Sequence, residues 1–456
     1  MAKKAVWVKC VLFICFISRP VHSEDLLVID EEIELFLEYL VNLIKDALGY
    51  QQKINVYVTN NQSLNAMATQ NGDIVINAGA IIQVDNFKEL IAILAHEVGH
   101  LAGYHMSTFL AIRPDIIKSS IIASIIGAGA AIISKDPTPF AAGVYAGQAL
   151  DMGQTLAKLR QKEAMADTKS AEAIIKLGWL SVFDGFVSLH RKLMAHGAVY
   201  NAYLSTHPQS QDRIDKFIEF LKEFKDAEIT SKVASLLENM QKKFNVIQWK
   251  LKALIYEPSM ILAQFKQPKD RVQRYARAMA LMRADKYKEA IENVDEAIKQ
   301  ADDSVKPSPL KEISIPHCME IKLMCLFNLH RYSELIKSFH VLQNKLRKNE
   351  VYRDITLIYA LAVTNVNPGK QEIVKAIKAV KKIHARHPDD VSAIGLLGRL
   401  NNLDGQQDHA SLYAAKAAVL RGDTEAAKLH AGRASSSKNP SVVRQAGDII
   451  SSVSDD

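Results

Sequence analysis

The sequence is poor in cysteine, with four such residues in 456. Cys10 and Cys15 lie in the first 23 residues, a segment with the pattern of a leader. Cys318 and Cys325 are seven residues apart on an expected helix. Two helical turns separate them by about 10 Å, which is too far for a disulfide. We therefore expect a protein that tolerates an oxidising compartment without an internal disulfide.

The sequence also lacks a strong excess of either charge. Its formal net charge is +7, from 57 basic and 50 acidic residues. Residues 1–23 hold four of the basic residues and no acidic one, so the rest carries 53 basic against 50 acidic residues, or +3. No basic stretch resembles a nucleic-acid-binding patch, and we expect no nucleic-acid partner.

Long uncharged apolar runs are missing too. Residues 116–133 come closest, but they fall just short of the usual membrane-spanning length and contain Lys118. We interpret this stretch as a buried or cleft-covering helix, with contact to a membrane surface as the alternative.

Residues 1–23 have the pattern of a secretory signal. Three lysines precede a short apolar run that ends at Ile17, and Val21 and Ser23 suit the small-residue rule for cleavage. This predicts export and cleavage after Ser23. The short run and Arg19 leave an uncleaved anchor as the alternative.

The most informative stretch is 89–104. Its apolar residues recur at spacings of three and four, which predicts a helix with one buried stripe. Its HEVGH motif places His96 and His100 on one face, where both imidazoles can reach a single ion. Glu97 lies beside them as a general base for water. Two histidine ligands, an open coordination position and a carboxylate base are typical of a zinc peptidase. Two histidines on an ordinary core helix are the alternative.

Two further motifs gain weight from following HEVGH. A catalytic zinc site needs three protein ligands, and the expected helix 148–177 contains the string EAMAD from Glu163 to Asp167. Alone, such a string is usually a solvated helix face. His207 lies at a break just before the next helix, which begins near Arg213. Alone, His207 would more often be a surface histidine.

The N-terminal part also predicts a small sheet. Residues 30–48 read as an amphipathic helix capped by Asp30, and 54–58 and 74–77 read as strands. The second strand is either a half-buried hairpin strand or an exposed edge that pairs with an extended peptide substrate. The pattern leaves both open. The substrate-pairing residues of the second alternative are Asp73, Ile74, Val75, Ile76 and Asn77.

From about residue 268 the pattern changes to short helix pairs. Residues 280–291 and 326–336 share a similar residue pattern, and further units centre on 359–383, 393–417 and 418–434. Helix pairs at spacings of about 34–45 residues suggest a tetratricopeptide-type solenoid. A plain helical bundle is the alternative.

Together these motifs resemble the zinc metallopeptidase family that includes the CAAX prenyl protease and the periplasmic beta-barrel assembly-enhancing proteases. The latter join such a domain to C-terminal tetratricopeptide repeats, and the resemblance covers essentially the whole chain after the leader. It rests on an edge-strand pattern within 65–79, the HEVGH and EAMAD motifs, and a THP…RI element within 206–214. Asn71 departs from relatives that carry proline or glycine in this turn, which puts only the shape of the cleft in doubt.

The resemblance implies roles for individual residues. Glu163 becomes the third ligand of one Zn²⁺ per chain, and Asp167 orients His96 or the ligand shell. His207 lies near the metal, where it either occupies the open position in a resting state or stabilises an oxyanion, with support from Arg213.

The expected fold is α+β and predominantly helical: a gluzincin-like zinc protease domain with a small sheet, then an all-α tetratricopeptide-type solenoid. The expected parts are a signal peptide, a protease domain, a helical connector, a repeat domain and a disordered tail. Their ranges are 1–23, 24–230, 231–267, 268–450 and 451–456.

The expected function is that of a periplasmic zinc endopeptidase, with contact to a membrane left open. It would degrade misassembled envelope proteins, while the repeats dock unfolded substrates or the outer-membrane assembly machinery. The alternative is a repeat-mediated scaffold or chaperone with a latent protease site.

Overall fold

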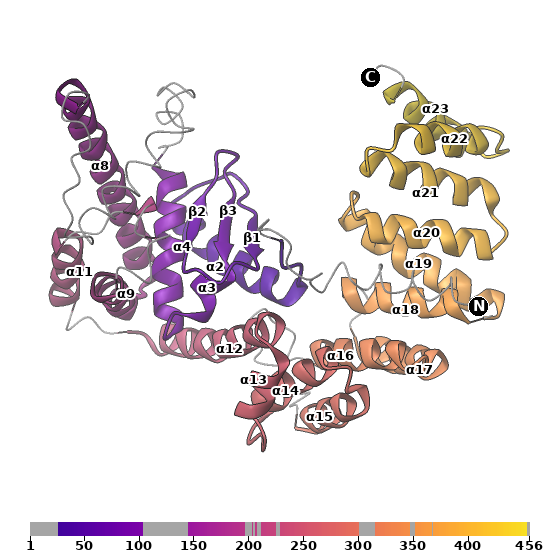
Figure 1. Cartoon of the computed structure of the whole chain (residues 1–456), viewed down its shortest axis with the longest axis horizontal. Helices are drawn as coiled ribbons and strands as arrows, with labels where there is room; N and C mark the ends of the chain where they lie inside the picture. The colour runs from indigo at the N-terminus through magenta and orange to yellow at the C-terminus, as the bar shows by residue number, and fades with distance from the viewer. Residues whose placement is uncertain are drawn as a thin grey trace. The chain divides into compact units, whose positions relative to one another are not determined.

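The computed structural model describes residues 26–103, 145–196, 203, 206–207, 211–224, 229–300, 315–346, 352–366 and 368–453 (Figure 1). The predicted signal peptide and the stretch 116–133 lie outside this set. The chain forms two compact units, divided at Ile255 and Tyr256, which are treated separately below. Within the described ranges, no helix is both long enough and apolar enough to cross a membrane.

The first unit combines helices with one small sheet, which confirms the expectation of a predominantly helical fold with a minor β component. Its elements are α2 (Glu31–Ala47), β1 (Val56–Thr59), β2 (Ala66–Ala68), β3 (Ile74–Asn77), α3 (Ala78–Ile82), α4 (Phe87–Ala102), α8 (Tyr145–Leu177), the 3₁₀ helix η2 (Leu180–Val182), α9 (Phe183–Ala195), α11 (Gln211–Glu223) and α12 (Ser231–Ile255).

Helix α2 forms as its sequence predicts. The Asp30 side chain accepts a hydrogen bond from the Ile33 N–H at 3.0 Å, which satisfies one of the free donors of the first turn. Gly49 follows the helix with a φ of +70°, a left-handed conformation that favours glycine. The apolar stripe of the helix is fully buried, and it comprises Ile33, Phe36, Leu37, Leu40, Val41 and Ile44.

The sheet has the strand order β1-β3-β2, with β3 parallel to β1 and antiparallel to β2. Both sides of β3 are therefore paired, and the prediction that residues 73–77 form an exposed substrate edge is wrong. The tight turn at Gly72, whose φ is +85°, folds β3 back against β2, while β1 takes its other side. Alternation of apolar residues identifies a strand, but it does not distinguish a central strand from an edge. The edge next to α4 is β2.

Helices α4 and α8 approach each other closely at Gly99. A Cβ atom on this residue would lie 2.5 Å from the carbonyl oxygen of Ala166. The glycine of HEVGH therefore allows the backbone of α8 to lie directly against the face of α4 that carries the histidines.

Helix α12 lies within the stretch expected to be a connector, and it is attached to α2 by a buried ionic cluster. Lys243 pairs with Glu32, and Lys250 pairs with Asp30 at 2.7 Å and with Glu32 at 2.9 Å. All four side chains are buried, and their two positive and two negative charges balance. Removing one member would leave an uncompensated charge in the interior, so the cluster fixes α12 within the first unit.

The described residues of the second unit form helices and turns without a strand, and its successive helices pack on their neighbours along the chain. Its helices are α13 (Pro258–Gln264), α14 (Arg271–Arg283), α15 (Tyr287–Lys299), α16 (Ile315–Asn328), α17 (Tyr332–Lys345), α18 (Arg353–Asn365), α19 (Lys370–Arg386), α20 (Val391–Leu403), α21 (Gln407–Leu420), α22 (Thr424–Ala434) and α23 (Pro440–Ser452). Since α23 extends to Ser452, the first residues of the predicted disordered tail are helical.

Four turns of this unit share one backbone geometry. Two residues after the helix end, a residue adopts a positive φ, and the next N–H bonds to the carbonyl five positions earlier at 2.9–3.0 Å. This is the Schellman arrangement, which satisfies the free carbonyls of a helix end. The residues with positive φ are Asp285, His330, Gly405 and Gly422.

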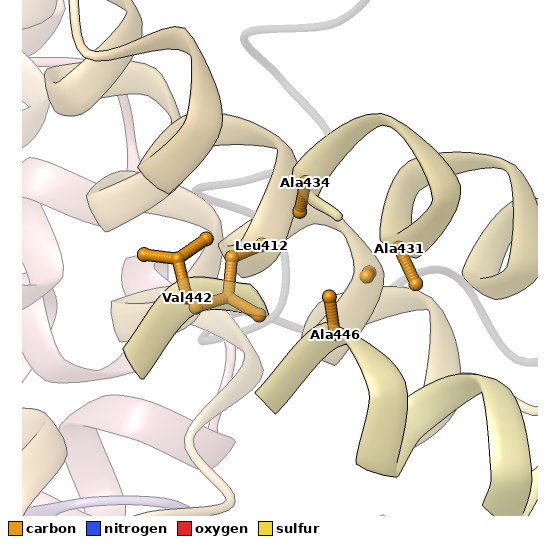
Figure 2. Packing of buried hydrophobic residues seen from close by; sticks show 6 residues of the cluster. Leu412, Ala431, Ala434, Val442 and Ala446 are labelled. Atoms are coloured by element: carbon orange, nitrogen blue, oxygen red, sulfur yellow. The ribbon is translucent and has the colours of Figure 1, made fainter. Parts of the chain in front are cut away.

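Small residues allow the last helices of the chain to pack closely. Figure 2 shows Leu412 of α21 beside residues of α22 and α23, namely Ala431, Ala434, Val442 and Ala446. In α16, Cys318 and Cys325 are buried free thiols on one helix. Burial raises the pKa of Cys325 to about 12.

Candidate metal centre

Helix α4 brings the two histidines of HEVGH together, as predicted. The helix begins at the N-cap Asn86, whose side chain accepts from the Glu89 N–H, and it continues to Ala102. His96 and His100 lie one turn apart, and their Nε2 atoms are 3.1 Å from each other. Both rings thus present the same nitrogen to one point.

Helix α8 adds the carboxylate of Glu163 to this point. Its Oε2 lies 3.1 Å from His96 Nε2, and its Oε1 lies 3.3 Å from His100 Nε2. Nδ1 of His207 lies 3.2 Å from His96 Nε2 and 3.3 Å from Glu163 Oε2. One ligand atom from each of these four residues lies within 4.8 Å of all the others.

These separations fit a single metal ion. Ligand atoms held about 2.1 Å from one ion at tetrahedral angles are about 3.4 Å from one another. Two or three imidazole nitrogens with one carboxylate form a donor set that suits Zn²⁺. The residues present therefore fit the ion that the sequence motifs predict.

Asp167 and Arg213 contact the candidate ligands His96 and Glu163. Asp167 Oδ1 lies 3.0 Å from His96 Nδ1, so this ring nitrogen can donate to it and leave Nε2 as the metal ligand. Arg213 donates to both oxygens of Asp167, at 2.7 and 2.8 Å, and its Nη1 lies 3.2 Å from Glu163 Oε2. All of these side chains are buried.

The two carboxylate oxygens of Glu97 have different surroundings. Its Oε2 accepts a hydrogen bond from the main-chain N–H of Ala68 at 2.8 Å. Its Oε1 is buried, has no hydrogen-bond partner among the described residues, and lies 3.4 Å from His207 Nε2. Buried polar atoms are almost always satisfied, so this oxygen marks a position where a polar ligand belongs.

The electrostatics of the cluster favour a cation. Burial opposes a charge on His96, but the nearby Glu163 and Asp167 carboxylates outweigh it and raise its pKa to about 10. Burial also opposes the charge on Glu163 and Asp167, and by itself it would raise their pKa values. The contacts of Glu163 with His96, His100 and His207, and of Asp167 with His96 and Arg213, hold both pKa values well below the usual range. The site thus stabilises positive charge among these donors, and a divalent ion would meet the same field more strongly than a proton.

The structure brings together all the predicted metal and catalytic candidates: His96, Glu97, His100, Glu163, Asp167, His207 and Arg213. It does not bring Asp73 there, since this carboxylate accepts from the main chain and side chain of Asn55 at the turn. The main-chain groups of Ala66 and Ala68 at the site were missed, because motif reading considers side chains.

Tyr203 was also missed. Its buried ring lies 4.6 Å from the His207 ring, and its carbonyl accepts from the His207 N–H. Burial raises the pKa of Tyr203 well above its usual value, and the charge of Glu97 adds to the effect. The spacing of four residues before His207 was an available signal.

Comparison with known proteins agrees with this geometry. Residues 33–220 match the profile of Peptidase family M48, and every metal and catalytic candidate lies within this range. This part of the chain is therefore similar to the metallopeptidases of family M48. The beta-barrel assembly-enhancing protease of Yersinia pestis is 28% identical over 93 residues, which are 20% of this chain and 19% of that protein. The chain thus matches about a fifth of that relative's length.

Proposed function

We propose that the chain is a zinc endopeptidase with one Zn²⁺ held by His96, His100 and Glu163. The observation that carries this proposal is the convergence of these donors at tetrahedral ligand spacing beside the unsatisfied Oε1 of Glu97. Bound there, zinc supplies a Lewis acid that polarises a peptide carbonyl.

The chain's own residues account for the movement of the proton. Glu97 takes a proton from water at Oε1 as the water attacks the peptide carbonyl, and then delivers it to the leaving amine. Asp167 holds His96 in the tautomer that leaves Nε2 free, and Arg213 fixes Asp167.

Strand β2 is the proposed docking edge for the peptide substrate. It is the edge of the sheet next to α4, and the main-chain groups of Ala66 and Ala68, on either side of the exposed Met67, contact the site. An extended peptide that adds to this edge would lie along Ala66 and Ala68, beside Glu97.

The proposed setting is quality control of envelope proteins in the periplasm, after export by the N-terminal signal. The helix pairs of the second unit are proposed to act as tetratricopeptide-type repeats that recruit misassembled outer-membrane proteins or the assembly machinery. The name of the Yersinia pestis relative supports this setting.

The second candidate function is a scaffold or chaperone with a latent protease site. The position of His207 favours it, because its Nδ1 is as close to His96 and Glu163 as the ligands are to one another. A fourth protein ligand would fill the position that a catalytic zinc site keeps open.

One experiment tests the peptidase. Purified wild type and Glu97→Gln are compared for zinc content and for cleavage of unfolded casein, with and without a chelator. We expect one zinc per chain in both proteins, and cleavage by wild type alone that the chelator abolishes. Bound zinc without cleavage by wild type would favour the latent alternative, and absence of zinc would contradict both.

A second experiment tests the latch. His207→Ala should keep its zinc and cleave casein faster than wild type if His207 closes the site. A rate no higher than that of wild type would count against a latch. A fall in kcat at constant zinc content would instead favour a role in stabilising the oxyanion.

A further inference from the structure

Every second residue of β2 turns its main-chain groups toward the catalytic residues. The Asn65 carbonyl and the Thr69 N–H bond to the β3 side, at 2.9 and 2.7 Å. Because successive residues of a strand alternate in direction, Ala66 and Ala68 turn their main-chain groups to the opposite side. There, Ala66 C=O lies 3.3 Å from His207 Nε2, and Ala68 N–H donates to Glu97.

The Ala68 contact makes the two oxygens of Glu97 unequal. Oε2 is bound to a main-chain donor that the pairing of β2 with β3 holds in place. Oε1 is then aimed at the space beside His207 and is buried there without a hydrogen-bond partner among the described residues. Helix α4 fixes one end of the Glu97 side chain, and β2 fixes the other.

We propose that the main-chain N–H of Ala68 is a positioning group for Glu97, which holds the carboxylate with Oε1 directed at the reacting water. The catalytic consequence rests on the proposed peptidase function, whereas the contact itself does not. The proposal also limits how substrate pairs with β2. Since the Ala68 N–H is committed to Glu97, the only outward N–H that this strand offers to a peptide is that of Ala66.

An amide-to-ester exchange at Ala68 in the full zinc-loaded chain tests the kinetic consequence. Lactic acid in place of the alanine removes the N–H and adds no bulk, whereas Ala68→Pro would place ring atoms against Glu97. We expect kcat for a casein-derived peptide to fall by about 10- to 100-fold, because a misplaced base attacks poorly. KM and zinc content should stay within about twofold of wild type.

The same exchange at Ala66 is the matched control. It removes an N–H from the same edge but leaves the Glu97 contact intact, so it should raise KM and change kcat little. A kcat at Ala68 that stays near the wild-type value, or equal effects of the two esters on kcat, would overturn the proposal.

A thermal-unfolding cycle tests the contact even in a protein without activity. The Ala68 ester should lower Tm in wild type, and lower it clearly less in the Glu97→Leu background, where no carboxylate accepts. The Ala66 ester should shift Tm equally in both backgrounds. Equal shifts for Ala68 would show that the contact is absent and overturn the inference. Coupled shifts in a chain that cleaves nothing would leave the contact standing and contradict the peptidase function.

Discussion

The two units differ in how far apart in the sequence their contacting residues lie. In the first, His96 meets Glu163, Asp167 and His207 across 67, 71 and 111 residues of sequence. In the second, each helix packs on its neighbours in the chain, and one turn geometry recurs with different residues. The site therefore depends on particular residues in a single arrangement, whereas the helical unit depends on a pattern that several residues can satisfy.

The largest expected effect is that of metal removal, which should change the stability of one unit and not of the other. A chelator should abolish cleavage and lower the stability of the first unit by about 4 kcal/mol if free zinc stood at a thousand times its Kd. The second unit should not respond, because none of its described residues belongs to the metal cluster. Calorimetry with and without chelator should show one transition that moves and one that does not, and two shifted transitions would contradict the comparison.

The next effect concerns glycine in a helix. Gly99→Ala should cost about 1–3 kcal/mol and release zinc, because its Cβ would lie 2.5 Å from the Ala166 carbonyl and push α8 away with Glu163. Zinc content and urea unfolding measure both effects.

Gly398→Ala in α20 is the matched control. The nearest atom to its Cβ would be 3.6 Å away, so the substitution should be neutral or stabilise by up to about 1 kcal/mol. A Gly99→Ala variant that binds zinc like wild type would show that the two helices can separate without harm to the site.

A smaller effect on zinc affinity is expected at Arg213, which contacts the candidate ligands through Asp167. Arg213→Lys loses the paired bonds to Asp167 and should weaken zinc affinity by about 10- to 100-fold. Lys216→Met removes another contact between α11 and α8, the exposed bond to Thr168, and should leave zinc affinity unchanged. Competition with a fluorescent zinc chelator measures both, and equal losses would mean that Arg213 acts only by joining the helices.

The smallest effect lies in the repeated turns. Gly405→Ala should cost about 1 kcal/mol through backbone strain alone, because φ is +80° and no atom lies within 4 Å of the added Cβ. Gly395→Ala, inside α20 and equally free of contacts, should be neutral or stabilising. Urea midpoints of the second unit compare the pair, and equal shifts would remove the role assigned to the turn.

Sequence reasoning reached the parts of the fold that local patterns determine. The apolar periodicity of α2 and α4 and the histidine spacing on α4 required no tertiary information. The order of the strands did require it: the pattern of residues 73–77 left a substrate edge and a half-buried strand both open, and the edge next to α4 is β2. The pairing of Lys250 with Asp30 and Glu32 could not be predicted either, because a lysine on an amphipathic helix gives no sign of burial.

The two buried thiols of α16 can be used to measure how often the helical unit opens. Cys318 and Cys325 are fully buried, and burial raises the pKa of Cys325 to about 12, so this thiol reacts very slowly with alkylating reagents. Alkylation in the native protein therefore requires opening of the helical unit, so the rate of alkylation reports the frequency of opening. Residues 33–220, which match the profile of Peptidase family M48, contain no cysteine that would add to the signal. Slower labelling in the presence of a candidate partner would therefore test the proposed recruitment by the helical unit, without any engineered probe.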